Sequence, residues 1–95
     1  MANYDRTVTT AATLLASKNF ERVGIIIDNS RSAQALYLGD SGAVTIATGI
    51  AIAAGGQYTS TANGESGSFF YKGDYYGIVA ADSESVSVLE LVTTR

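Results

Sequence analysis

The chain has 95 residues, of which 46% are hydrophobic and 16% are charged, and its formal net charge is −3. This length supports one domain with one modest core, and the apolar content is too high for a disordered chain. Because the chain has no Cys and no His, it lacks disulfides, thiolate nucleophiles and the commonest metal ligands and general bases. The acidic balance argues against a nucleic-acid partner, since phosphate binding depends on Lys and Arg.

The first segment, residues 1–11, is polar and rich in threonine. We expect it to be an extended N-terminal arm outside a single folded domain formed by residues 12–95. Its only large apolar side chains are Met1, Tyr4 and Val8, which are too few to offset the entropy of ordering the backbone. The arm should therefore be mobile in an isolated subunit and become ordered on a neighbouring protein, with Tyr4 as its anchor.

The remaining residues are typical of an all-β domain, because short runs rich in β-branched and aromatic residues alternate with turn residues. In chain order, strands are predicted at residues 12–16, 20–29, 35–39, 43–46, 50–53, 57–61, 69–72, 75–81 and 85–92. The first of these could instead be a single helical turn. The clearest strand is 20–29, in which Val23, Ile25 and Ile27 share one face at a period of two.

Eight or nine short strands and no strong helix predict an antiparallel β-sandwich of jelly-roll type, with a closed eight-stranded barrel as the alternative. The expected core consists of alternating apolar residues of these strands: Val23, Ile25, Ile27, Leu36, Leu38, Ile50, Ile52, Ile78, Val86 and Val88.

No catalytic, cofactor or metal site is predicted. Asp40, Asp82 and Glu84 could offer oxygen ligands to calcium, but they lack the spacing of a calcium-binding loop. Residues 39–42 spell GDSG, a string found around serine-protease nucleophiles, yet a serine nucleophile needs a base and the chain has no histidine. We therefore expect a protein that is not an enzyme and holds no cofactor.

Aromatic residues are concentrated in residues 69–76, which contain five of the nine in the chain. On a hairpin, Phe69, Tyr71 and Tyr75 are candidates for contact with a protein or a sugar. The alternative interpretation is cross-strand packing that only stabilises the hairpin.

The last predicted strand is apolar on both faces, with Val86 and Val88 on one side and Leu89 and Leu91 on the other. A strand of this kind is central in a sandwich or covered by another subunit. Leu89 and Leu91 are therefore candidate interface residues of a homo-oligomer, although a slipped register or a bulge would explain the pattern too.

Residues 12–39 (ATLLASKNFERVGIIIDNSRSAQALYLG), 48–58 (TGIAIAAGGQY) and 75–90 (YYGIVAADSESVSVLE) carry a resemblance to a known family. Their order and pattern resemble small β-sandwich proteins encoded among the structural genes of tailed bacteriophages. The matching positions are Arg22, Asn29, Ser30, Gly39, Gly55 and Glu90. The family's usual proline near the Gly55 position is replaced here by alanine.

The resemblance implies a virion component without catalytic residues. Its first implication is a capsid decoration (cement) protein that forms a homo-oligomer, with a trimer favoured, and clamps the major capsid protein. The alternative is a tail or head-fibre adaptor that contacts host carbohydrate through the aromatic residues 69–76. Residues 1–10 lack a signal-peptide core and no run reaches the roughly 20 residues that span a bilayer. We therefore expect no membrane partner, assembly in the host cytoplasm and a final location on the capsid surface of the virion.

Overall fold

The computed structural model describes residues 2–61, 71 and 73–92. These residues form eight β-strands and no helix, which confirms the predicted all-β class. The strands are β1 (Ala2–Thr9), β2 (Thr13–Ala16), β3 (Arg22–Asp28), β4 (Leu36–Gly39), β5 (Ile50–Ile52), β6 (Gln57–Thr61), β7 (Tyr75–Ile78) and β8 (Ser83–Val92). Over the same residues, the structure offers no helix of the length and hydropathy needed to cross a membrane.

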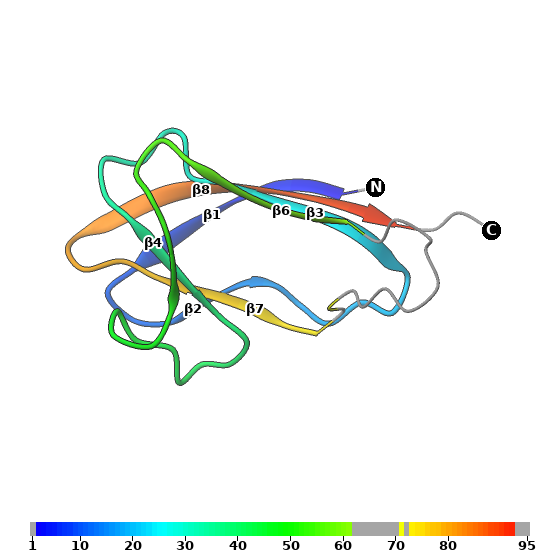
Figure 1. The fold of residues 1–95 in the computed structure, drawn as a ribbon, viewed down its shortest axis with the longest axis horizontal. Helices are drawn as coiled ribbons and strands as arrows, with labels where there is room; N and C mark the ends of the chain where they lie inside the picture. Colours follow the sequence, from blue (N-terminus) through cyan, green and yellow to red (C-terminus); the bar gives the residue numbers. More distant parts are fainter. Residues whose placement is uncertain (1, 62–70, 72, 93–95) are drawn as a thin grey trace.

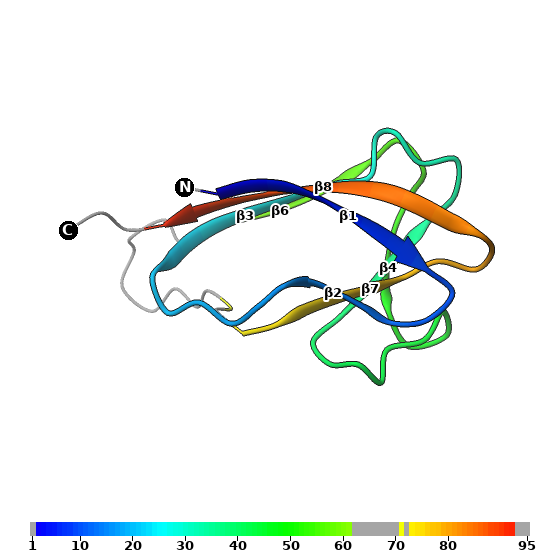
Figure 2. The same ribbon diagram turned by 180° about the vertical axis from the view of Figure 1, so that it is seen from behind.

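The eight strands lie in two four-stranded antiparallel sheets, ordered β1-β8-β3-β6 and β2-β7-β4-β5. Figure 1 shows them as two layers. Figure 2 shows the molecule from the opposite side, with the edge strands β1 and β2 toward the viewer. Each strand pairs with its counterpart counted from the other end of the described chain: β1 with β8, β2 with β7, β3 with β6 and β4 with β5. The arrangement is consistent with the predicted sandwich rather than with a single closed barrel.

The core lies between the inner faces of the two sheets. Eight of the ten predicted core residues are buried, and seven of them lie there: Ile25, Ile27, Leu36, Leu38, Ile52, Val86 and Val88. The eighth, Ile78, is buried on the other face of its sheet, opposite Tyr37. The prediction is wrong for Ile50, which is 68% exposed, and Val23 is only half-buried. Ile50 lies on the edge strand β5, where the opposite sheet does not cover it.

The N-terminal segment belongs to the sandwich instead of forming a separate arm. Strand β1 pairs with β8 along its whole length, from Ala2 opposite Glu90 to Thr9 opposite Ser83. Val8 is fully buried, and the Val79 amide donates to the Thr9 carbonyl. The threonine-rich sequence is suited to an extended strand. Its backbone pairs with β8 of the same chain, and not with a neighbouring protein as expected.

One predicted strand is wrong in the structure, and another cannot be compared with it. Residues 43–46 form turns in place of a strand, and the Thr45 carbonyl accepts hydrogen bonds from the Thr48 and Gly49 amides. The buried Val44 side chain packs directly against Gly39 and Gly49. A Cβ atom added to Gly39 would lie 2.5 Å from the Val44 side chain, and one added to Gly49 would lie 3.1 Å from it. The predicted strand 69–72 falls largely outside the described residues.

Candidate functional site

A charged pair lies inside the sandwich. Arg22 on β3 is fully buried and donates from Nε to Oε2 of Glu90 on β8 at 2.7 Å. Its other guanidinium nitrogens donate to the carbonyls of Gly73 and Ser17 at 3.0 and 2.7 Å. Four groups from separate parts of the chain are thereby joined, and none of the three guanidinium nitrogens is left without an acceptor.

Tyr4 completes this network from β1. Its hydroxyl donates to Oε1 of Glu90 at 2.9 Å, so both carboxylate oxygens are hydrogen-bonded. Burial and the adjacent Glu90 carboxylate raise the pKa of Tyr4 to about 12, because both disfavour a phenolate at this position. Tyr4 was predicted to anchor an arm on another protein, and in the structure it holds β1 within its own sheet.

The other positions that carried the family resemblance also have structural roles. Asn29 is fully buried, and its side-chain nitrogen lies within hydrogen-bond distance of the Gln34, Ile52 and Ala53 carbonyls. Gly55 adopts a φ of 82°, which favours glycine. These residues maintain turns and the contact between the sheets, and nothing in their geometry points to catalysis.

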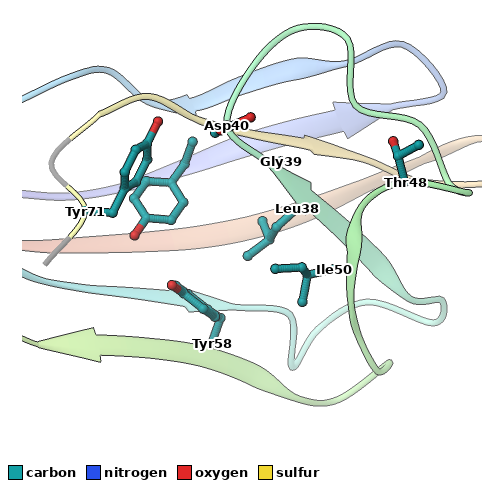
Figure 3. A pocket seen from close by; sticks show the side chains of 8 residues that line it. Leu38, Gly39, Asp40, Thr48, Ile50, Tyr58 and Tyr71 are labelled. Atoms are coloured by element: carbon teal, nitrogen blue, oxygen red, sulfur yellow. The ribbon is translucent and has the colours of Figure 1, made fainter. Parts of the chain in front are cut away.

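A pocket of about 380 Å³ opens between the edge strand β6 of one sheet and strands β4, β5 and β7 of the other. It is lined by Leu38, Gly39, Asp40, Thr48, Ile50, Tyr58, Tyr71 and Tyr75. In Figure 3, Tyr58 and Tyr71 lie on opposite sides of the pocket, with Leu38 and Ile50 beside them. Its volume falls in the range of small-molecule sites.

Three tyrosines form the aromatic part of this pocket. The Tyr75 ring lies 5.9 Å from that of Tyr58 at 57°, and 5.2 Å from that of Tyr71 at 78°. The second pair packs edge to face and the first is tilted, so the three rings face the pocket at different angles. The Tyr75 hydroxyl is buried and has no hydrogen-bond partner among the residues that the structure describes.

The polar groups of the pocket have a negative bias. Asp40 is exposed, and over the described part of the chain its carboxylate makes no hydrogen bond or ion pair. Burial, followed by the Asp40 and Asp74 carboxylates, raises the pKa of Tyr71. Burial also raises the pKa of Tyr75, and both hydroxyls are neutral donors at ordinary pH.

The outward face of the β1-β8-β3-β6 sheet carries a second feature. Ile25 and Ile27 point into the core, so the register directs Ile26, Leu89 and Leu91 away from it. Ile26 lies directly opposite Leu89, and all three side chains are half-buried. We call these three residues the outer strip.

The predicted interface residues therefore occupy three separate places. Leu89 and Leu91 are in the outer strip, Tyr4 lies on the buried Glu90, and Tyr71 and Tyr75 line the pocket. Phe69 lies outside the described residues. Tyr75 is only 5% exposed, so almost none of its side chain is available on the molecular surface.

Sequence analysis missed Tyr58 as a partner of this aromatic cluster. Its sequence signal is the alternation of β6, where Tyr58 and Ser60 share the inward face and Gln57 and Thr59 the outward one. That alternation identifies the face but not the neighbour, because Tyr71 and Tyr75 reach Tyr58 only through the packing of the two sheets.

No group of three or more acidic side chains that could hold a metal ion is found in the described part of the chain. Glu84, one of the three carboxylates considered for calcium, accepts a hydrogen bond from Gln34 at 3.1 Å. Comparison with protein-family models, curated proteins and solved structures finds no match to this chain in any of the three.

Proposed function

We propose that this protein is a non-enzymatic structural component of a bacteriophage virion, a capsid decoration protein with a jelly-roll fold. A jelly roll has eight strands in two antiparallel sheets, and the pairing of each strand with its counterpart from the other chain end supports that assignment. Jelly rolls are common in viral capsid and lectin domains. The fold alone does not determine the function, so the proposal depends on the surface.

The outer strip carries the proposal. A sheet face that water alone covered would place polar residues at these positions, whereas Ile26, Leu89 and Leu91 form a continuous apolar patch. Asn3 and Thr59 flank it on the two adjacent strands. An apolar centre with a polar rim is the usual composition of a protein interface.

The occupant of this face is a second copy of the chain in a closed ring, with a trimer favoured. In a trimer the strip meets a different surface of the next copy, and such contacts form a ring where the rotation between copies closes. A symmetric ring on the capsid then presents equal contacts to several copies of the major capsid protein. Many weak contacts of this kind raise the overall affinity without any single strong one.

The first experiment measures the molar mass of the purified full chain by light scattering over a range of concentrations. We expect a trimer, and we expect Leu89→Lys to be monomeric with an unchanged circular dichroism spectrum. Ser85→Lys is the matched control. Ser85 is exposed and lies four residues before Leu89 on β8, so both side chains are on the same face of the sheet. A monomeric wild-type chain at all concentrations would contradict the oligomer.

The second experiment tests the location. Quantitative mass spectrometry of phage particles that encode the chain should find it in a copy number comparable to that of the major capsid protein. A copy number typical of a tail or fibre part would favour the alternative role, and absence from the particles would overturn the proposal.

A further inference from the structure

We infer that the pocket lined by Tyr58, Tyr71 and Tyr75 is a binding site for the ring of a neutral saccharide. This inference concerns the inner face of the sandwich at β6, on the opposite side of the sheet from the outer strip. It does not depend on the proposed place of the protein in a virion.

The first argument is the kind of surface that the pocket offers. Saccharide rings have apolar C–H faces and a rim of hydroxyl groups, and aromatic side chains with polar tips are suited to both. Tyr58 and Tyr71 lie on opposite sides of the pocket, and Leu38 and Ile50 add apolar surface (Figure 3). A volume of about 380 Å³ is at the small end for ligand sites and is suited to one or two sugar rings.

The pocket also offers a polar group without a partner. The Asp40 carboxylate is exposed, lines the pocket and is unpaired within the described chain. The Tyr75 hydroxyl is buried beside Tyr58, out of a ligand's reach, so Tyr75 contributes its ring to the pocket wall. A ligand with several hydroxyl groups would donate to Asp40 and pack its apolar ring face on the tyrosines.

The charge of the site disfavours an acidic ligand. Among the described residues of the lining, Asp40 is the only charged one, and Asp74 adds a second carboxylate close to Tyr71. Both disfavour acidic sugars. The Arg22 guanidinium carbon lies 5.3 Å from the centre of the Tyr75 ring, but the Glu90 carboxylate neutralises its charge. The two carboxylates at the pocket would attract a cation, so a cationic ligand is the competing outcome that the test must separate from a neutral sugar.

The test is a ¹⁵N-resolved NMR titration of the full chain with D-glucose, D-galactose, D-mannose and N-acetyl-D-glucosamine. N-acetylneuraminic acid serves as the acidic probe and N-trimethyl-lysine amide as the cationic probe. We expect at least one neutral sugar to shift the amides of residues 38–40, 58 and 75, with weaker or no shifts from the two charged probes.

Two substitutions and their controls identify the site. Asp40→Asn is at an exposed position and should weaken sugar binding about tenfold, the effect of losing one charge-assisted hydrogen bond. Asp82→Asn is its control, because Asp82 does not line the pocket and asparagine tolerates its positive φ of 56°. Tyr71→Ala should abolish binding, whereas Tyr37→Ala, on a residue outside the pocket lining, should not.

The inference is overturned if no neutral sugar shifts the pocket amides. It is also overturned if the cationic probe alone shifts them, or if Asp40→Asn binds the sugar as tightly as the wild type. If Tyr71→Ala does not fold, Asp40→Asn still decides the outcome. Loss of sugar binding would leave the trimer measurement untouched, so the two proposals fail separately.

Discussion

Arg22 and Glu90 form an ion pair inside the sandwich, with 2.7 Å between Nε and Oε2 and side chains that are 0% and 10% exposed. The pair joins β3 to β8, and Tyr4 extends it to β1. It therefore links three of the four strands in one sheet, while the Ser17 and Gly73 carbonyls connect Arg22 to the two segments that flank β2 and β7.

Removing one partner of this pair should be strongly destabilising. Arg22→Met leaves the Glu90 carboxylate with only Tyr4, and Glu90→Gln leaves a buried guanidinium charge without its counterion. Each should lower the free energy of unfolding by about 3–5 kcal/mol, measured by urea denaturation. The double variant should lose less than the sum of the two, because neither charge is then left alone.

Arg31→Met is the control for this comparison. Arg31 pairs with Asp5 at 3.1 Å, but their side chains are 53% and 62% exposed. An exposed pair contributes about 0–1 kcal/mol. A similar loss for Arg31→Met and Arg22→Met would show that the buried pair has no special role in stability.

The structure changes the expectation for the N-terminus. Deletion of residues 2–9 removes the partner strand of β8, the buried Val8 and the hydrogen bond from Tyr4 to Glu90. Burial of Val8 alone contributes about 1.5–3 kcal/mol. The deletion should lower Tm by more than about 10 °C in differential scanning calorimetry. An unchanged Tm would show instead that this segment acts as the mobile arm that the sequence suggested.

Two of the isoleucines predicted for the core, Ile25 and Ile50, should respond differently to truncation. Ile25→Ala should cost about 2–5 kcal/mol, because its fully buried side chain would leave a cavity between the sheets. Ile50→Ala should change stability by no more than about 0.5 kcal/mol, since 68% of this residue is already exposed. Urea denaturation of both variants in parallel tests the comparison, and equal losses would contradict the placement of Ile50.

These residues show how far the sequence could predict the fold. The period of two correctly assigned the inner faces at Ile25, Ile27, Val86 and Val88. The same period also assigned Val23 to the inner face, but the structure leaves Val23 half-buried and buries Arg22 beside it.

The reason is a bulge. Between Arg22 and Gly24, β3 advances two residues while β8 advances only one, from Val92 to Leu91. The additional residue, Val23, reverses the face of Arg22 and brings it inward. Gly24 is the one local signal, because an isolated glycine inside a strand pattern suggests a bulge. It does not show which side chain turns inward, so the buried charge did not follow from it. The pocket was missed for a related reason, because Tyr58 meets Tyr75 through packing between the sheets and not through sequence spacing.

The raised pKa of Tyr4 should make the free energy of unfolding decrease at alkaline pH. Its pKa is raised from 10.0 in the unfolded chain to about 12 in the folded state, by burial and by Glu90. Below pH 10 the hydroxyl is protonated in both states, and its contribution to stability is fully present. As the pH rises from 10 toward 12, the unfolded chain releases this proton while the folded chain retains it, so the free energy of unfolding falls.

Tyr4→Phe should be less stable than the wild type at pH 8, because it lacks the hydrogen bond to Glu90. It should also lose less stability than the wild type between pH 9 and 11. Urea denaturation of both proteins across this range checks the difference in slope, and parallel curves would show that Tyr4 does not contribute to the pH dependence.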